Sequence, residues 1–305
     1  SVPLLALAQL PPLPFEPARS RLVLAGYAQP WPGALQLVDE TTGTKLAMLE
    51  RRGVLGTLAA ALSAGPSAVW DCGPGIEVAL HDGHLASAEP LAVLAGSNRL
   101  AIETASGAWE VIGFAQAELV APGRYRLTQL LRGLEGTGPS VGAAPIGSRL
   151  MLLDSRVATL AIEPPWLGET RGLRLYAGSA DLMGTALTLA VDPGPALPLP
   201  PVHLRAVRAP GGDITFTWTR VSRADGDGWG LAEAPLEHGP EAYRVSILDG
   251  VTVRRVIETA LPQALYASAE QGLDFGSLPA SFSFTIAQVS PVLGAGHPAS
   301  GEFHG

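Results

Sequence analysis

A serine flanked by two glycines is the first place where this sequence could carry out chemistry. Residues 138–142 read Gly-Pro-Ser-Val-Gly and match the nucleophile-elbow pattern, with Ser140 in the position of the nucleophile. An elbow needs a strand, a sharp turn and a helix, and Pro139 and Pro145 disfavour that helix. No His and Asp arrangement stands out to complete a triad. We therefore interpret the segment as a plain loop and predict no catalytic residue and no enzymatic activity.

Two histidines resemble the beginning of a metal site. His81 and His84 flank Asp82-Gly83, a dipeptide typical of a two-residue hairpin turn, which would place the imidazoles across from each other. A stable zinc site needs three or four ligands, and only Asp82 lies nearby in the sequence. The pattern is therefore interpreted as a hairpin tip without a metal.

A glycine-rich acidic stretch resembles the opening of a calcium loop. Asp225 and Asp227 alternate with glycines before Trp229, but an EF-hand needs ligands where Trp229 and Leu236 stand. A long loop between strands is the alternative interpretation, and we predict neither a metal nor a cofactor here.

Aromatic faces can stack on sugars, and tryptophan is the largest of them. Trp109 and Trp218 fall in alternating patterns that predict burial, whereas Trp31 lies in Gln-Pro-Trp-Pro-Gly and Trp229 in a glycine-rich loop. The candidate contacts for a receptor or a glycan are therefore Trp31, Arg223, Asp225, Asp227 and Trp229.

Composition favours an all-β fold. The 305 residues include 36 glycines and 27 prolines, which helix interiors reject, yet 47% are hydrophobic and only 16% are charged. The net charge is −8, and the basic residues are scattered arginines with Lys45 as the only lysine. Since nucleic-acid binding requires clustered cations, we predict no direct contact of this segment with DNA or RNA.

The single cysteine, Cys72, excludes an intrachain disulfide and a thiolate metal cluster, and fits folding in a cytosolic compartment. No run approaches 18 apolar residues, so no membrane span is predicted. The first residues lack the basic region of a signal peptide and are broken by prolines. Ser1 in place of methionine suggests a fragment or a processed product, and simple methionine removal is the alternative.

A proline-rich run, residues 191–201, predicts a stiff connector that divides the chain. Beyond it, residues 214–219 alternate Ile, Phe and Trp with threonines, and residues 243–247 and 282–286 repeat the alternation. Residues 201–305 thus resemble a fibronectin type III β-sandwich, with another small sandwich as the alternative. The chain is predicted to comprise an extended segment (1–14), an irregular β-sandwich or barrel-like domain (15–165), a looser connecting region (166–200) and this sandwich.

The upstream domain shows strand patterns that are less regular. The candidate strands are residues 21–28, 76–87, 98–114, 124–131 and 148–155. Ser106-Gly107 marks a tight reversal, and only residues 53–63 could hold a short helix.

Three segments in order carry a resemblance to a known family. They are the run from Trp109 to Thr137 (WEVIGFAQAELVAPGRYRLTQLLRGLEGT), the stretch Arg223 to Val245 with its Asp-Gly-Asp-Gly-Trp and Glu-Ala-Tyr-Arg-Val, and Gln29 to Gly33. Together they resemble the C-terminal region of the large tail-tip proteins of gene transfer agents and related siphophages. Leu134 and Gly228 depart from the family's usual residues, at positions for which we can argue no chemical role.

This resemblance implies a structural component of the tail tip or baseplate of a phage-like DNA-delivery particle, assembled in the bacterial cytoplasm. It implies other tail-hub and baseplate proteins as partners, a homotrimeric hub, and attachment to a cell-surface glycan or receptor. In that family the full protein is much longer, with hub domains and a glycoside-hydrolase-like barrel ahead of this region, and no catalytic residue carries over. The alternative function is a carbohydrate-binding or adhesin fragment of a secreted or surface protein.

Overall fold

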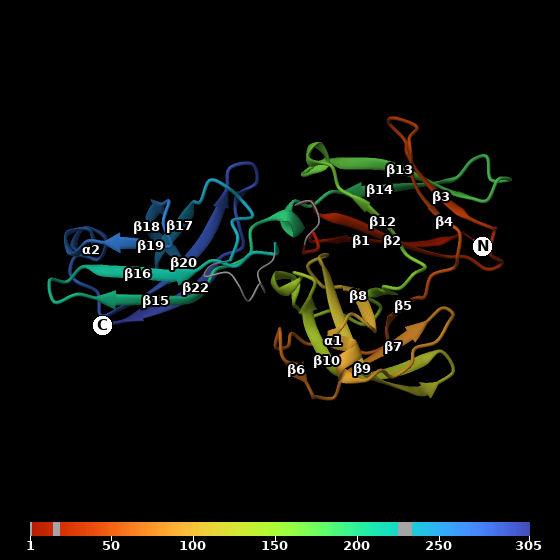
Figure 1. Cartoon of the computed structure of the whole chain (residues 1–305), viewed down its shortest axis with the longest axis horizontal. Coiled ribbons are helices and arrows are strands. Elements are labelled where there is room, and N and C mark those ends of the chain that lie inside the picture. Colours follow the sequence, from red (N-terminus) through yellow and green to blue (C-terminus); the bar gives the residue numbers. More distant parts are fainter. Residues whose placement is uncertain (1, 15–18, 225–233) are drawn as a thin grey trace. The chain divides into compact units, whose positions relative to one another are not determined.

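The computed structural model describes residues 2–14, 19–224 and 234–305. The chain divides into two compact units, of which the first comprises residues 1–12 and 19–195 and the second residues 196–305 with the short segment 13–18. Strands dominate both units in the described part of the chain (Figure 1). The predicted all-β class is therefore confirmed.

The second unit is a sandwich of two antiparallel sheets. One sheet has the order β15-β16-β19, and the other has the order β18-β17-β20 with β22 on the far side of β20. The strands are β15 (Val202–Arg208), β16 (Ile214–Thr219), β17 (Tyr243–Asp249), β18 (Thr252–Thr259), β19 (Gln263–Tyr266), β20 (Ser281–Ser290), β21 (Gly294–Ala295) and β22 (Ala299–His304), and helix α2 (Ser268–Phe275) precedes β20. The sheet β15-β16-β19 thus faces the sheet β18-β17-β20-β22; with the two-residue β21 left aside, this is the arrangement of strands in fibronectin type III domains.

Alternation in the sequence explains this core. In β16 the side chains of Ile214, Phe216 and Trp218 are buried while the threonines between them are exposed. Phe282 of β20 lies at the centre, with its ring near five other aromatic rings (Phe216, Tyr266, Phe275, Phe284 and Phe303). The predicted burial of Trp218 is confirmed, since only 6% of the residue is exposed.

The first unit contains a second sandwich with the same strand order. One sheet has the order β1-β2-β12 and the other β14-β13-β3-β4. The strands are β1 (Leu4–Leu10), β2 (Arg21–Tyr27), β3 (Leu35–Asp39), β4 (Lys45–Leu49), β12 (Ala158–Ala161), β13 (Thr170–Ala177) and β14 (Thr185–Ala190). Between the fourth and fifth strands, where the second unit has a single turn, about a hundred residues are inserted.

The insertion is a closed antiparallel barrel. Its sheet runs β6-β10-β7-β5-β11-β8-β9, and β9 pairs again with β10, so that all strands except β6 close into a ring. The strands are β5 (Leu55–Leu58), β6 (Trp70–Asp71), β7 (Ile76–Leu80), β8 (Arg99–Glu103), β9 (Trp109–Ala121), β10 (Arg124–Leu134) and β11 (Arg149–Leu152), and helix α1 (Pro90–Leu94) precedes β8. Closure leaves the six strands of the ring without free edges, which is how barrels avoid unwanted pairing.

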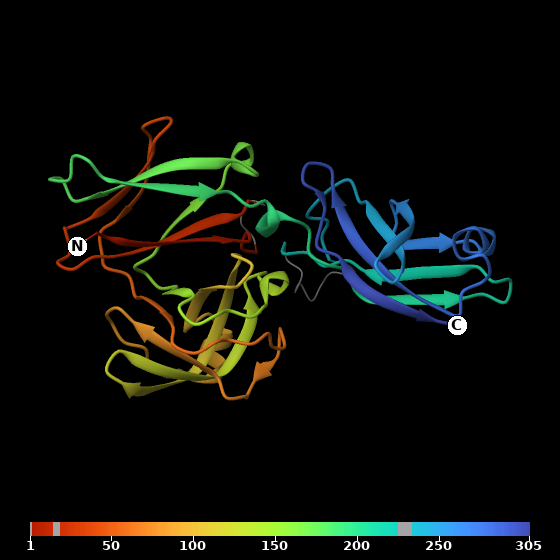
Figure 2. The same cartoon turned by 180° about the vertical axis from the view of Figure 1, so that it is seen from behind.

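The sheet β1-β2-β12 separates the barrel from the rest of its sandwich (Figures 1 and 2). Leu22 and Leu24 of β2 pack into the sandwich core, whereas Val23 and Ala25 pack with Trp109 and other residues on the outside of the barrel. Because both faces of β2 are covered, its burial is continuous rather than alternating. The predicted burial of Trp109 is confirmed, with 5% of the residue exposed.

Two local expectations differ from the structure. Residues 53–63 form strand β5 and a loop instead of a helix, because β5 pairs with β7 on one side and β11 on the other. A Cβ on Gly56 would lie 2.3 Å from the carbonyl oxygen of Ala79, so this glycine permits the close approach. Asp82-Gly83 does not join paired strands: β7 pairs with β5 and β10, and the chain after Gly83 leads to α1.

The domain limits also differ. The segment 1–14 was expected to be merely extended, but its β1 is the first strand of a sandwich. The region 166–200 was expected to be a loose connection, but it supplies β13 and β14, whose apolar residues Leu173, Leu175 and Leu189 complete the sandwich core. β13 lies far in the sequence from its partner β3, because the barrel separates the two halves of the sandwich.

Candidate functional site

A buried ion pair lies inside one end of the barrel. Glu110 follows the inward-facing alternation of Ile112 and Phe114, and it meets Arg132 of the neighbouring strand β10. Nε and Nη2 of Arg132 donate to the two carboxylate oxygens of Glu110 at 2.5 and 2.7 Å, and both side chains are at most 1% exposed. Arg132 also donates to the carbonyl oxygens of Ser63 and Gly142, each at 3.0 Å. The pair therefore holds together two strands and the two loops that cover this end of the barrel.

The same hairpin explains the motif from Trp109 to Thr137. The amide of Gly133 donates to Oε1 of Glu110 at 3.2 Å, while the hydroxyl of Thr137 donates to the carbonyl of Leu134 and accepts from the amide of Val111. Glu110, Arg132 and Thr137 of the motif thus hold the barrel end together.

The Ser140 segment lies at this barrel end. Gly138–Ser140 forms one 3-10 turn, and an extended residue, Val141, follows it. No helix follows the turn, so the serine is not held in the geometry of a nucleophile elbow.

In the second sandwich, Arg223 is buried and not on the surface as expected. Its side chain is 4% exposed, its Nη1 lies 3.2 Å from Oε1 of Glu237, and its Nη2 donates to the carbonyl of Leu197 at 2.9 Å. Burial lowers the pKa of neighbouring His238 below its ordinary value. Arg223 therefore ties the start of the second unit to the loop between β16 and β17. The other candidates in this loop, Asp225, Asp227 and Trp229, lie outside the described residues.

Trp31 lies in the corresponding loop of the first sandwich, between β2 and β3. Its ring is half-buried and packs against the sandwich core, and its Nε1 donates to the carbonyl of Gly33 at 3.0 Å. Trp31 therefore anchors its loop and offers only part of its ring to solvent.

A cavity of about 540 Å³ opens beside this loop. Its lining comes from the Trp31 loop, from the outer face of β3, β4 and β13, and from the turn that joins β13 to β14 (Pro32, Gly33, Ala34, Gln36, Met48, Tyr176, Gly178, Ser179 and Asp181). Sequence reasoning missed this site because it treated residues 166–200 as a connection. The sequence did carry one signal of this site: Tyr176 alternates with the buried Leu175, as expected for a strand with one outward face.

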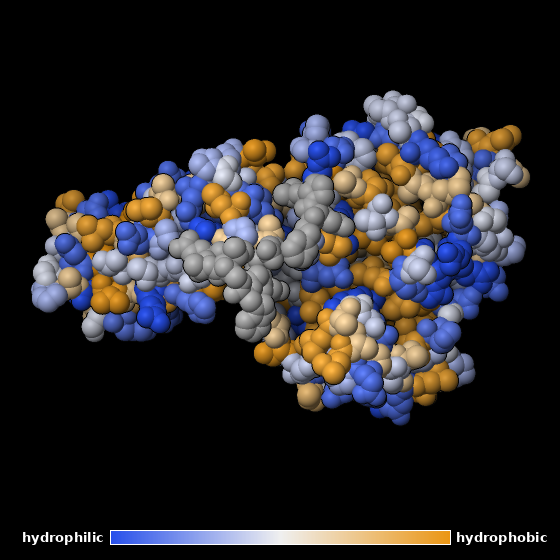
Figure 3. All heavy atoms as spheres, viewed as in Figure 1, coloured by the Kyte–Doolittle hydropathy of each residue, from blue (hydrophilic) through white to orange (hydrophobic). Residues whose placement is uncertain are grey.

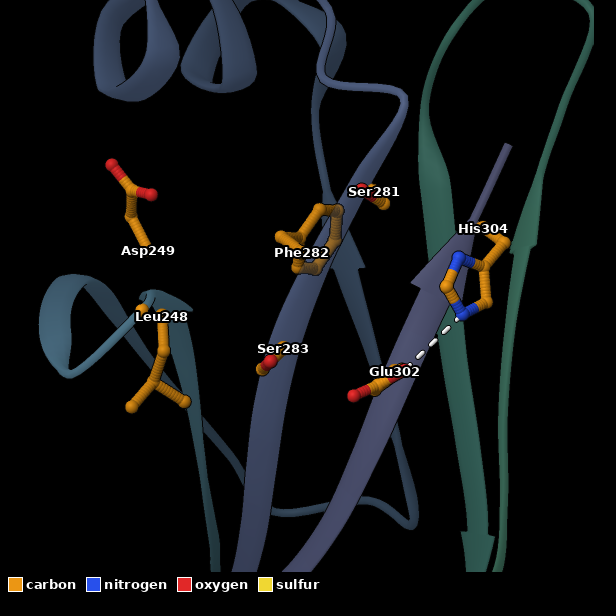
Figure 4. A pocket seen from close by; sticks show the side chains of 8 residues that line it. Leu248, Asp249, Ser281, Phe282, Ser283, Glu302 and His304 are labelled. Carbon is orange, nitrogen blue, oxygen red and sulfur yellow. Dashed lines mark ion pairs between the residues drawn. The ribbon is translucent and has the colours of Figure 1, made fainter.

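A smaller groove of about 280 Å³ lies on the second sandwich (Figure 4). Ser281 and Ser283 of β20 lie next to Glu302 and His304 of β22, and Asp249 ends β17. Nε2 of His304 lies 3.3 Å from Glu302, but both side chains are at least 70% exposed, and Asp249 is engaged with Arg254. This groove lacks the desolvated environment that tunes catalytic groups.

His81 and Asp82, from the hairpin predicted from the sequence, make other contacts. The His81 ring stacks on Tyr27 with 5.7 Å between centroids, and Asp82 pairs with Arg52. Within residues 2–14, 19–224 and 234–305, no group of three or more His, Cys, Asp or Glu side chains could hold a metal ion. In the same ranges, no helix is long and apolar enough to cross a membrane.

The fold defines a class of protein: two sandwiches of fibronectin type III topology, the first carrying an inserted six-stranded barrel. Among solved structures, the chain is similar to domains d3–d4 of the rat CD45 extracellular region, at 9% identity over 50% of this chain and 72% of that one, with a TM-score of 0.25. It is also similar to the FN1–FN3 domains of chicken CNTN1, at 8% identity over 98% and 97% of the two chains, with a TM-score of 0.25. The strand order carries the fold assignment, and these low overall scores do not.

A family match is more specific. Residues 53–151 match the family described as "Rcc01698-like, C-terminal", named after a protein of Rhodobacter capsulatus that is associated with its gene transfer agent. The matched residues begin just before β5 and end within β11, so the match coincides with the barrel. No curated protein matches the chain.

Proposed function

We propose that this chain is a structural component of the tail tip or baseplate of a phage-like DNA-delivery particle of the gene-transfer-agent type. The observation that carries the proposal is the match of residues 53–151, because it covers one complete structural element, the barrel. In this role the chain is assembled in the bacterial cytoplasm with other hub and baseplate proteins, as part of a homotrimer, and contributes to attachment or penetration. It performs no catalysis.

The architecture supports a mechanical role. The closed barrel has a core of its own and packs on the sandwich through a second core, so it resists deformation, and its ring of strands has no free edge. Helix α1 exposes 79% of Leu91 and 58% of Leu94 on the barrel, and Figure 3 shows apolar surface there. Exposed apolar patches of this kind favour contact with other proteins. The net charge of −8 disfavours direct contact with DNA.

Deleting residues 196–305 from the full-length protein is expected to leave tails that assemble but deliver DNA poorly. The barrel and the first sandwich, which we assign to assembly, stay intact, whereas the second sandwich and its loops are lost. Particles are counted by electron microscopy, and DNA transfer to recipient cells is measured on the same preparation.

Two outcomes of this deletion would contradict the division of roles. Loss of all tails would assign the second sandwich to assembly, and normal delivery would make it dispensable. Particles complemented with the undeleted gene are the control for both measurements.

A carbohydrate-binding or adhesin fragment is the second candidate function. Two sandwiches of fibronectin type III topology and the open cavity beside Trp31 favour it. It differs from the first candidate in location: an adhesin would be found on the cell surface or in the medium, free of particles.

A further inference from the structure

The cavity beside Trp31 has the size and setting of a small-molecule site. Its volume of about 540 Å³ lies within the range of roughly 300–1,000 Å³ that ligand sites occupy. It lies where the loop between β2 and β3 meets the turn between β13 and β14, at one end of the first sandwich. Loops at the end of such a sandwich are a common position for recognition.

Three side chains form a row along the cavity floor. Tyr176 of β13 is the cross-strand partner of Gln36 in β3, and Gln36 is in turn the partner of Met48 in β4. The three side chains point outward, because their chain neighbours Leu35, Leu37, Leu49 and Leu175 are buried in the core. The floor thus offers an aromatic ring, an amide and a thioether side by side.

The polar groups of this row are free to bind a ligand. Among the described residues, neither the Tyr176 hydroxyl nor the Gln36 side-chain amide makes a hydrogen bond. Both groups can donate and accept, as the hydroxyls of a sugar do. An aromatic ring beside an amide therefore suits a ligand with an apolar face and a rim of hydroxyls.

The cavity lining carries little charge, which favours a ligand without a strong charge, and Lys45 lies beside it with its Nζ 3.8 Å from the sulfur of Met48. No lysine or arginine is among its lining residues in the described chain, and Asp181 is its one acidic group. The Asp181 carboxylate accepts from the amides of Ala177, Gly184 and Met183 at 2.8–3.2 Å, and these bonds hold its pKa below the ordinary value. Asp181 thus stays ionised, repels anions, and uses its oxygens to shape the turn.

The cavity walls are held in place before any ligand arrives. Trp31 anchors one wall through the core and its bond to Gly33. On the other wall, Gly178 has a φ of +75°, and a Cβ there would lie 2.6 Å from the carbonyl oxygen of Pro32. The two loops therefore touch, and this preorganisation lowers the entropic cost of binding.

We propose that this cavity binds a neutral saccharide, with Tyr176 stacking on the apolar face of a sugar ring and Gln36 bonding to its hydroxyls. The inference rests on the proposed attachment role and supplies its ligand class and site. Trp31 acts as a positioning residue that holds the loop.

The test is titration of the purified full chain with neutral trisaccharides of glucose, galactose, mannose and N-acetylglucosamine, followed by NMR chemical shifts. At least one trisaccharide is expected to bind. Tyr176→Ala and Gln36→Ala are each expected to weaken that binding at least tenfold, and Tyr176→Phe is expected to weaken it less because it keeps the ring. Thr188→Ala is the matched control, since Thr188 is exposed on neighbouring β14 outside the cavity. Unchanged circular dichroism and melting temperature show that each variant folds.

The proposal is overturned if no neutral trisaccharide binds at millimolar concentration. It is also overturned if binding survives Tyr176→Ala and Gln36→Ala, or if an acidic saccharide or a peptide shifts the cavity resonances instead. Because the measurement needs no particle, its failure leaves the structural role intact. Failure of the structural role would be seen in particle composition and would not alter this titration.

Discussion

Arg132→Met is expected to destabilise the barrel by about 3–5 kcal/mol, because it leaves the carboxylate of Glu110 buried without its partner. The methionine fills much of the same volume as the arginine. The loss of stability therefore measures the cost of the unpaired carboxylate and of the lost hydrogen bonds to Ser63 and Gly142. Hydrogen exchange in the full chain is the measurement. Amides of β9 and β10 should exchange more than about a hundredfold faster, while those of the second sandwich stay unchanged.

The same strand supplies a matched control. Arg126 of β10 pairs with Glu77 at 2.9 Å on the exposed surface, so Arg126→Met should leave exchange in the barrel nearly unchanged. The double variant Glu110→Leu with Arg132→Met should recover part of the lost stability, since it removes both buried charges. A loss for Arg132→Met no larger than for Arg126→Met would mean that the buried pair does not hold the barrel end.

Trp218→Ala is expected to cost the second sandwich about 3–5 kcal/mol. The indole is 6% exposed and packs edge-on against Tyr243 with 5.1 Å between ring centroids, so truncation opens a cavity in the core. Exchange should accelerate in β16 and β17 and remain unchanged in the barrel.

The Trp218→Phe variant distinguishes the effect of the lost ring volume from the effect of the lost indole N–H. The indole N–H of Trp218 is buried and has no hydrogen-bond partner among the described residues, so phenylalanine removes an unpaired donor while it keeps an aromatic ring. We expect this variant to lose well under half of the stability that Trp218→Ala loses. Equal losses would show that the whole indole is required, and a loss below about 1 kcal/mol for Trp218→Ala would contradict its place in the core.

Local sequence patterns were sufficient where one face of a strand is buried. The alternation in β16, β17 and β20 predicted the second sandwich, including the burial of Trp218. Ser106-Gly107 predicted the reversal between β8 and β9, where Gly107 has a φ of +83° and its amide donates to Thr104.

Local patterns did not predict elements whose structure depends on pairing with strands far away in the sequence. The strands β13 and β14 were taken as a connection because β3, the partner of β13, lies more than a hundred residues earlier, across the barrel. Residues 53–63 have the alanines and leucines of a helix, but pairing on both edges makes β5 a strand.

The candidate contacts depended on tertiary structure in the same way. A charged residue in a glycine-rich loop, Arg223, was expected on the surface, yet its bonds to Glu237 and Leu197 compensate its burial. Trp31 was expected to expose its ring to a receptor or glycan, and it instead anchors a loop beside a cavity. The row of Tyr176, Gln36 and Met48 comes from three strands and has no signature in any one segment.

The most direct test of the central claim is the location of the chain on purified particles. Gold-labelled antibodies against residues 53–151, the matched barrel, are applied to particles from the source cells and viewed by electron microscopy. The structural role predicts label at the tail tip of intact particles. Label confined to cell envelopes or to soluble protein, with particles unlabelled and lacking the chain by mass spectrometry, would contradict it.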